Sequence, residues 1–248
     1  MKNLYIICFL LVFNACTTTN SHLSKVTAKT INVDSTLSPS KEINDFIAPY
    51  KEKLDEEMQR VLSYNPKELN KFPENLQSTA GNFMADLCVE MANPMYQQKT
   101  NQSIDFAMLN HGGIRAIVPE GKVTTERAFK IMPFDNELVV VTLSGDKIKE
   151  LVEFFIARNR AHPLSKNIEL VIENDDYSLK INGKPFDDTK NYSVVTSDYL
   201  QNGGDRMNFF KNPEKLVKLD YKVRDAIINY LEKVDTIQTK LDNRVILK

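Results

Sequence analysis

The sequence predicts an α+β (mixed α/β) fold in which helices flank a mixed sheet. Segments with apolar residues at helical spacing and segments rich in β-branched residues follow one another without strict alternation. Asn182-Gly183 separates two extended segments and is a strong signal for a tight hairpin, which joins antiparallel strands. Hydrophobic residues make up 42% of the 248, enough for a globular core and unlike a disordered chain.

Helices are predicted from apolar spacing, with capping residues and prolines at their ends. A long first helix begins near Lys41 and is marked by apolar residues at helical spacing: Ile43, Phe46, Ile47, Leu54, Met58, Val61 and Leu62. The second runs from Ser78 or Thr79 to about Asn93, where Pro94 limits it. Further helices are predicted to start near Thr124, to run from Ser144 to Phe155, and to cover 223–234.

Strands are predicted where apolar and β-branched residues cluster between turn signals. These segments are 104–109, 122–124, 137–143, 168–172, 178–181, 192–196 and 243–247. The strands at 104–109 and 192–196 each lead directly into a loop that contains a pair of glycines.

The two glycine loops, residues 110–115 and 199–205, contain four of the eight glycines of the chain. Paired glycines let the backbone approach a ligand closely and adopt φ > 0 without steric cost. In the first loop Asn110 offers a donor and an acceptor, and Arg115 offers a planar cationic fork. A loop at the end of a strand is a favoured binding location in α/β sheets. A tight turn with a surface arginine explains the same residues equally well.

Two aromatic residues accompany these loops. Phe134 follows Pro133 just before a predicted strand, and Tyr199 precedes the second glycine pair. Taken alone, each ring is explained better as a structural or core residue than as a stacking platform. Taken together, the two rings can hold a planar ligand between them.

The N-terminal residues read as a targeting segment. Lys2 precedes an apolar run over 4–13, which is too short to span a bilayer but typical of a signal peptide. Ala15-Cys16 follows, and a small residue before a cysteine at this point resembles a bacterial lipobox. We therefore predict a lipoprotein signal peptide over 1–15 and lipidation of Cys16. An ordinary signal peptide with an incidental cysteine is the alternative.

The remainder divides into a flexible tether over 16–40, rich in Ser, Thr and Asn, and one folded domain over 41–248. The predicted location is that of a membrane-anchored bacterial lipoprotein, periplasmic or at the cell surface. Cys88 is then the only cysteine of the mature domain, and its apolar surroundings predict a small buried core residue.

Composition excludes several kinds of chemistry. The formal net charge of −1 gives no electrostatic basis for nucleic-acid binding. The only histidines are His22, His111 and His162, too few for a two-metal hydrolytic centre. No phosphate-binding loop, dinucleotide fingerprint, nucleophile elbow or zinc-protease motif is present. We assign no catalytic residue, no metal site and no cofactor to this chain.

Considered together, the motifs resemble the C-terminal, substrate-specificity domain of the 5′-nucleotidase/UDP-sugar hydrolase family. That family has an N-x-G-G-[IL]-R loop, a P-F-x-N step and a Y/F-L-x-x-G-G-D segment, and all three occur here in that order. Residues 81–86 also resemble its G-N-L-x-x-D helix. The resemblance covers roughly residues 40–248 and implies the fold of that domain.

The resemblance also implies roles for individual residues. Phe134 and Tyr199 would clamp a nucleobase, and Asn110 and Arg115 of the first loop, which includes Gly113, would contact the substrate. Asp205 would bind the ribose hydroxyls through charge-assisted hydrogen bonds. The predicted substrate-binding residues are therefore Asn110, Gly113, Arg115, Phe134, Tyr199 and Asp205.

The sequence departs from the family pattern at several positions. Residues 74–78 lack the arginine that many members carry before the G-N-L-x-x-D helix. His111 replaces a small residue, and Arg206-Met207 stands where Gly-Tyr is usual. Ligand preference is therefore expected to differ from that of a nucleotidase for adenosine monophosphate.

Family enzymes carry a metallophosphatase domain before this one, whereas here a lipid anchor and tether are expected in its place. The resemblance implies the recognition half of a split 5′-nucleotidase-type phosphohydrolase in nucleotide catabolism, inactive alone. A separately encoded metallophosphatase would be its partner and would hold the divalent metals. The alternative is a non-catalytic surface lipoprotein that binds nucleosides or nucleotides. An autonomous hydrolase is disfavoured by the shortage of histidine ligands.

Overall fold

The computed structural model describes residues 22–174 and 176–248. The chain forms two compact units, one ending at Ala48 and the other running from Pro49 to Lys248. The division falls inside the helix α2 (Lys41–Gln59). The predicted signal peptide and its lipidation residue Cys16 lie outside the described residues.

In the first unit, residues 22–40 form neither helix nor strand. A turn near Asp34 is fixed because its Oδ1 accepts hydrogen bonds from the Thr36 backbone nitrogen at 2.9 Å and hydroxyl at 2.6 Å. Helix α2 then begins at Lys41, the residue at which the sequence predicted helical order to start.

A mixed sheet lies at the centre of the second unit. Its order is β2 (Phe106–Ala107), β8 (Asn191–Ser197), β4 (Glu137–Ser144) and β9 (Lys215–Lys222). Strands β2 and β8 are parallel, whereas β8–β4 and β4–β9 are antiparallel pairs. The predicted fold class, α+β with a mixed sheet, is confirmed.

The central sheet is covered on both faces because alternate residues of each strand point to opposite sides. In β4, Leu138 and Val140 belong to one hydrophobic cluster, and Val139 and Val141 belong to the other. All four side chains are almost fully buried. Such a two-sided strand reads as a continuous apolar run, which is the pattern of residues 138–141.

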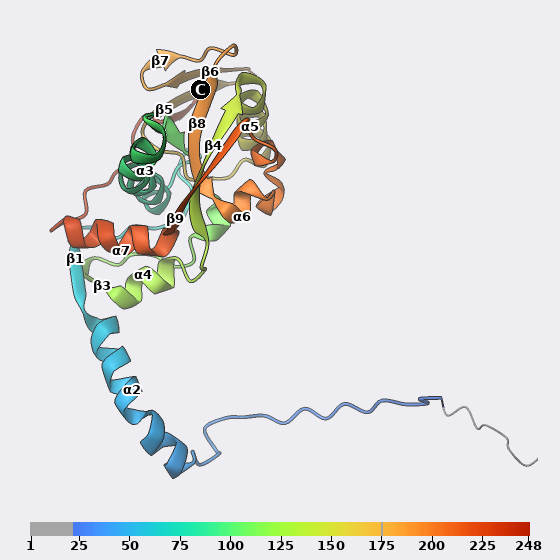
Figure 1. The fold of residues 1–248 in the computed structure, drawn as a ribbon, viewed down its shortest axis with the longest axis vertical. Coiled ribbons are helices and arrows are strands. Elements are labelled where there is room, and N and C mark those ends of the chain that lie inside the picture. The colour runs from blue at the N-terminus through green and yellow to red at the C-terminus, as the bar shows by residue number, and fades with distance from the viewer. Residues whose placement is uncertain (1–21, 175) are drawn as a thin grey trace, which may run out of the picture. The chain divides into compact units, whose positions relative to one another are not determined.

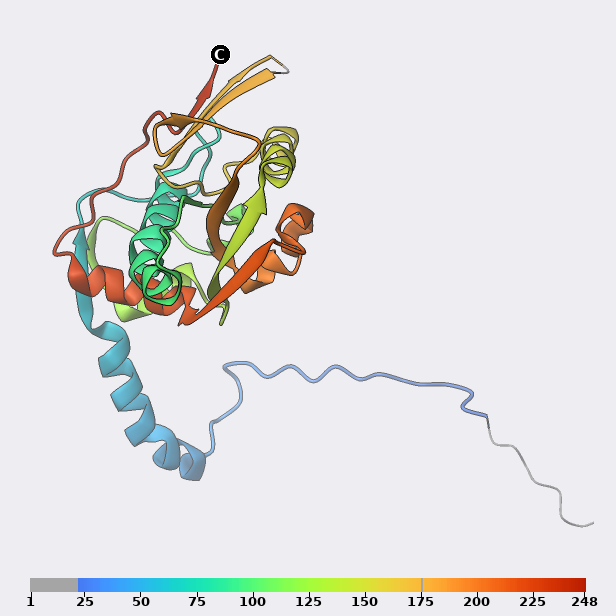
Figure 2. The same ribbon diagram turned by 45° about the horizontal axis from the view of Figure 1, so that its top comes forward.

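Helices lie on opposite sides of this sheet: α3 (Thr79–Thr100) and α7 (Val223–Lys233) pack together on one face, and α5 (Gly145–Arg158) packs on the other (Figures 1 and 2). A second mixed sheet extends the α5 side. Its order is β10 (Val245–Leu247), β5 (Ile168–Glu173), β6 (Asp176–Ile181) and β7 (Lys184–Pro185).

The predicted Asn182-Gly183 turn joins β6 to β7. Asn182 and Gly183 have φ of 53° and 72°, the pair of positive angles that a two-residue hairpin turn of this type requires. The hairpin prediction is confirmed, although β7 is only two residues long.

The first predicted helix is too long. Helix α2 ends at Gln59, and Val61 and Leu62 instead open strand β1 (Val61–Asn65), which pairs antiparallel with β3 (Gly121–Thr124). A short apolar run fits both a helical and a strand period. Pairing with β3, some 60 residues further along the chain, decides in favour of the strand.

The second predicted helix is too short. Helix α3 continues through Pro94 to Thr100, although an internal proline removes a hydrogen bond and costs about 3 kcal/mol. Beyond the proline, Tyr96 is fully buried, and its hydroxyl lies 3.0 Å from the Ser193 hydroxyl of β8. Burial of this ring offsets the penalty and keeps the last two turns helical.

Strand β9 was not predicted, and β2 is shorter than the predicted strand over 104–109. The sequence of β9 is rich in lysine, a composition that disfavours a central strand but suits the edge position it occupies. The segment around β2 is nonetheless buried from Phe106 to Leu109, as predicted.

Cys88 is completely buried on α3, as predicted, and burial raises the pKa of its thiol to about 12. In the part of the chain that the structure describes, no helix is both long and apolar enough to cross a bilayer.

Candidate functional site

Three loops meet where the strands β2 and β8 end. Because β2 and β8 are parallel neighbours, the loops that follow them leave the sheet on the same side. Strand β4 is antiparallel to β8, and Leu138 near its start pairs with Ser197 at the end of β8. The segment before β4 therefore reaches the same side of the sheet. Strand order and direction thus bring together segments that are distant in sequence.

A pocket of about 310 Å³ lies between these loops. It is lined by all six predicted substrate-binding residues: Asn110, Gly113, Arg115, Phe134, Tyr199 and Asp205. The other residues that line it are Met84, Leu109, Gly112, Ile114, Met132, Asn136, Ser197 and Val223. The volume lies at the lower end of the range typical of small-molecule sites.

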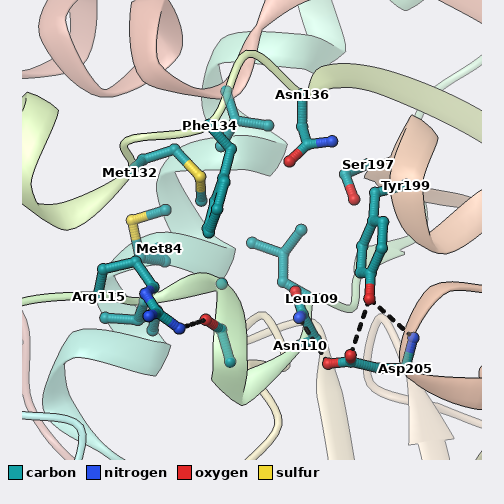
Figure 3. Close-up of a pocket in the computed structure, with 14 residues that line it drawn as sticks. Met84, Leu109, Asn110, Arg115, Met132, Phe134, Asn136, Ser197, Tyr199 and Asp205 are labelled. Atoms are coloured by element: carbon teal, nitrogen blue, oxygen red, sulfur yellow. Dashed lines mark hydrogen bonds between the residues drawn. The ribbon is translucent and has the colours of Figure 1, made fainter. Parts of the chain in front are cut away.

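Phe134 and Tyr199 stand on opposite sides of the pocket with their rings turned toward it (Figure 3). Their exposed fractions are 42% and 45%, so neither ring belongs to the core, and the interpretation of Phe134 as a core residue is wrong. Buried apolar side chains, among them Leu109 and Met132, close the pocket below the rings. The result is an apolar slot between two aromatic faces.

Asp205 forms the polar end of the slot. Its Oδ2 accepts a hydrogen bond from Asn110 Nδ2 at 2.7 Å, and its Oδ1 accepts one from the Tyr199 hydroxyl at 3.0 Å. The Tyr199 hydroxyl also accepts a bond from the Asp205 backbone nitrogen at 3.2 Å. The two glycine loops, about 90 residues apart in sequence, are therefore joined by Asp205 (Figure 3).

Glycine is required where these side chains pass close to the backbone. A Cβ on Gly113 would lie 2.7 Å from Asn110 Oδ1, and a Cβ on Gly204 would lie 2.4 Å from the Tyr199 ring. One glycine of each pair, Gly113 and Gly204, therefore makes room for a neighbouring group of the pocket rather than only for a turn.

Arg115 lies at the side of the pocket nearest Phe134. Its guanidinium carbon is 5.8 Å from the centre of the Phe134 ring, within the range of a cation–π contact. One of its nitrogens donates to the Gly112 carbonyl at 3.4 Å (Figure 3). The remaining donors of the fork are available to a ligand.

Two residues that sequence reasoning missed hold the loops in place. The first is Asp198, at the start of the short helix α6 (Asp198–Gln201). Its Oδ1 accepts hydrogen bonds from Asn136 Nδ2 and from the Glu137 backbone nitrogen, each at 3.1 Å. This fixes the Asn136 amide so that its oxygen faces the slot (Figure 3).

The second is Arg224, near the start of α7 and only 9% exposed. Its guanidinium donates to the carbonyls of Met132 at 3.3 Å and Phe134 at 3.2 Å, and it pairs with Asp135 at 2.5 Å. These bonds fix the backbone that carries the Phe134 ring. A charged residue on the apolar face of a predicted helix is the sequence signal that could have identified it.

The family profile described as "5′-nucleotidase, C-terminal domain" matches residues 68–212. This chain belongs to that family. The match includes both glycine loops and both aromatic rings of the pocket.

Curated relatives are considerably longer than the matched region. The chain is 28% identical over 188 residues to the cell wall protein Lmo0130 of Listeria monocytogenes, covering 69% of this chain and 23% of that protein. It is 27% identical over 143 residues to the protein UshA of Escherichia coli, covering 55% of this chain and 26% of UshA. It thus spans about a quarter of the length of these relatives.

Solved structures share the fold of this 5′-nucleotidase C-terminal domain. A 5′-nucleotidase precursor of Thermus thermophilus superposes with a TM-score of 0.67 at 20% identity, covering 82% of this chain and 42% of that one. The NAD nucleotidase of Haemophilus influenzae gives 0.63 at 22% identity, covering 84% and 41%. The predicted C-terminal-domain-like fold is confirmed.

The motif over residues 81–86, which resembles the G-N-L-x-x-D helix of the family, lies mostly outside the pocket. Within residues 81–86, Met84 lines the slot, but Asp86 pairs with the buried Arg244 at 2.9 Å and accepts from the Lys166 backbone nitrogen at 2.7 Å. Asp86 therefore joins α3 to the segments before β5 and β10.

Histidines lie close to the site but not in the slot. His162 is buried and its Nδ1 accepts a hydrogen bond from the His111 backbone nitrogen at 3.3 Å. Burial lowers the pKa of His162 to about 4, and burial also lowers the pKa of His111. Among residues 22–174 and 176–248, no group of three or more His, Cys, Asp or Glu is arranged to hold a metal ion.

Proposed function

We propose that this domain recognises a nucleoside or nucleotide, with the base stacked between Phe134 and Tyr199. The observation that carries the proposal is the pair of half-exposed rings facing one another over an apolar floor. Base stacking on an aromatic side chain contributes about 1–3 kcal/mol. An apolar slot with few polar groups suits a flat, weakly polar ring system better than a chain-like ligand.

The polar end of the slot matches the sugar. An ionised carboxylate has about four acceptor sites, and Asn110 and Tyr199 occupy two of those on Asp205. The remaining sites suit two vicinal hydroxyls, whose bonds to a carboxylate are charge-assisted. Asn136 presents its oxygen between the rings as an acceptor for an amino group of a base.

We propose further that the domain works with a separately encoded metallophosphatase as a split 5′-nucleotidase-type phosphohydrolase in nucleotide catabolism. The support is membership in the 5′-nucleotidase C-terminal family and the ligand-sized pocket that the family motifs line. The partner would supply the divalent metals. Lipidation at Cys16 would place the domain at the membrane surface, in the periplasm or outside the cell.

Ligand recognition is tested by calorimetric titration of the protein with adenosine and with adenosine monophosphate. Phe134→Ala is expected to weaken binding by about 1–3 kcal/mol through loss of one stacking face. Asp205→Asn keeps the shape but removes the charged acceptor, and a loss of similar size is expected. Phe72→Ala is the matched control, because Phe72 is 69% exposed and does not line the slot. Absence of binding at millimolar ligand would overturn the assignment.

The split arrangement is tested by phosphate release from adenosine monophosphate. The protein alone, with added Mn²⁺ or Zn²⁺, is expected to be inactive, and activity is expected after addition of a metallophosphatase from the same organism. Metal-dependent turnover by the isolated protein would contradict this proposal. If the protein binds the ligand but no added metallophosphatase releases phosphate, the result would favour the alternative, a non-catalytic nucleoside-binding lipoprotein.

A further inference from the structure

A second hollow shares Asp205 with the aromatic slot. It has a volume of about 480 Å³ and is lined by Phe154, Ala157, Arg158, Arg160, His162, Asp205 and Arg206. We call it the arginine pocket. Its arginines come from two separate segments. Arg158 and Arg160 lie at the end of α5 and in the loop that follows it, and Arg206 directly follows the second glycine loop. The recognition role proposed above uses none of these three arginines.

The arginine pocket carries an excess of positive charge. Three arginines and one carboxylate line it, and the oxygens of that carboxylate, Asp205, already accept bonds from Asn110 and Tyr199. Within the described residues, the side chains of Arg158, Arg160 and Arg206 take part in no ion pair, whereas Arg60, Arg224 and Arg244 each do. Arg158 packs over the Phe154 ring at 5.1 Å, which leaves the donors at its edge available.

A buried donor lies in the wall of this pocket. His162 is 7% exposed, and its Nδ1 accepts a hydrogen bond from the His111 backbone nitrogen at 3.3 Å. A neutral imidazole whose Nδ1 is the acceptor carries its proton on Nε2. That Nε2 is buried and has no hydrogen-bond partner among the described residues. An unpaired buried donor is unfavourable unless a ligand or water accepts from it.

The backbone conformation of Arg206 supports a role for its side chain in ligand binding. Arg206 has φ of 65°, in the left-handed region that glycine adopts without penalty and other residues rarely adopt. The chain thus retains a strained arginine at the rim of a cationic hollow, as is common where a side chain serves a ligand.

We propose that the arginine pocket binds a phosphate group, separately from the nucleoside slot. Guanidinium forks match phosphate oxygens in pairs, and three arginines line this hollow together with the imidazole of His162. The phosphate comes either from a free anion or from a nucleotide that also fills the slot, since Asp205 lines both hollows.

The test is calorimetric titration of the protein with pyrophosphate. The double variant Arg158→Gln/Arg160→Gln is expected to bind at least about tenfold more weakly. Arg206→Gly is also expected to weaken binding, and it is safe for folding because glycine suits the positive φ. Arg127→Gln on helix α4 (Thr125–Ile131) removes the same charge away from both hollows and should change affinity less than about twofold.

Titration with adenosine and adenosine diphosphate separates the two sources of phosphate. If the phosphate belongs to a nucleotide in the slot, the double variant loses affinity for adenosine diphosphate but not for adenosine. If it is a free anion, only pyrophosphate binding falls. The proposal is overturned if pyrophosphate and adenosine diphosphate each bind the double variant as tightly as the unaltered protein. It is also overturned if neither of them binds either protein. Pyrophosphate binding without adenosine binding would overturn only the nucleoside assignment.

Discussion

Tyr199 and Asp205 form a reciprocal pair across the second glycine loop. The Tyr199 hydroxyl donates to Asp205 Oδ1 at 3.0 Å and accepts from the Asp205 backbone nitrogen at 3.2 Å. The Tyr199 ring and the Asp205 carboxylate are therefore held by one another. A change at either residue is expected to alter both the base and the sugar ends of the proposed site.

Removal of the hydroxyl and removal of the ring are expected to have different effects. Tyr199→Phe keeps the stacking face but frees Asp205, so adenosine affinity should fall by about 0.5–1.5 kcal/mol, the net value of one hydrogen bond. Tyr199→Ala should lose about 1–3 kcal/mol more from stacking. Calorimetry measures both. Equal affinities of the two variants would show that the ring does not contact the ligand.

Gly204→Ala is expected to damage the slot with little loss of stability. The new Cβ would lie 2.4 Å from the half-exposed Tyr199 ring, which must swing away and lose about 1–3 kcal/mol of stacking with the base. Gly183→Ala is the contrasting control. There φ is 72° and no atom lies nearby, so stability should fall by about 1–2 kcal/mol while adenosine affinity stays unchanged. Urea unfolding and calorimetry on both variants separate the two effects.

Arg244→Met is expected to destabilise the domain strongly. Arg244 is 4% exposed, pairs with Asp86 at 2.9 Å and Asp242 at 2.7 Å, and donates to the Leu164 carbonyl at 2.7 Å. Removing one partner of a buried ion pair costs about 3–5 kcal/mol.

The control is Lys180→Met, which removes an exposed pair with Glu169 and should cost less than about 1 kcal/mol. Urea unfolding compares the two variants. Equal midpoints would mean that the buried cluster adds nothing to stability.

Stability is expected to fall on acidification because of His162. Burial lowers its pKa from 6.5 to about 4 in the folded state, and Arg158, Arg160 and His111 act in the same direction while Asp205 opposes them. The unfolded state binds more protons between these two values, so stability is complete above 6.5 and is lost as the pH falls toward 4. Between about pH 7 and about pH 5 the loss from His162 is about 2 kcal/mol.

Urea unfolding at these two pH values measures the slope, and His162→Gln should flatten it. An unchanged slope in that variant would assign the acid sensitivity to other groups, such as His111, whose pKa is lowered mainly by burial.

Cys16→Ser tests the lipoprotein assignment. The variant should leave the membrane fraction, because a serine cannot carry the thioether-linked lipid. A single acyl chain anchors only marginally, so firm attachment of the unaltered protein implies more than one chain. Fractionation followed by mass spectrometry of the N-terminus is the measurement. A mature terminus elsewhere, without lipid, would refute the assignment.

Local signals in the sequence predicted the residues of the site more accurately than they predicted where helices and strands begin and end. The glycine pairs, Pro133-Phe134 and Tyr199 were not decisive one by one, but together they carried the family resemblance that predicted six of the residues lining the slot. Arg224 and Asp198 were missed, since their roles depend on carbonyls and amides from distant segments.

The sequence by itself determined the mixture of helices and strands, the Asn182-Gly183 hairpin and six of the residues that line the slot. Tertiary structure alone decided that Val61 starts a strand, that α3 continues past Pro94, and that lysine-rich β9 joins the sheet edge. It also placed Arg158 and Arg160 beside Arg206. The physical reason is that local propensities differ by about 1 kcal/mol or less per residue, and by about 3 kcal/mol for a proline inside a helix. Strand pairing and side-chain burial between distant segments contribute more.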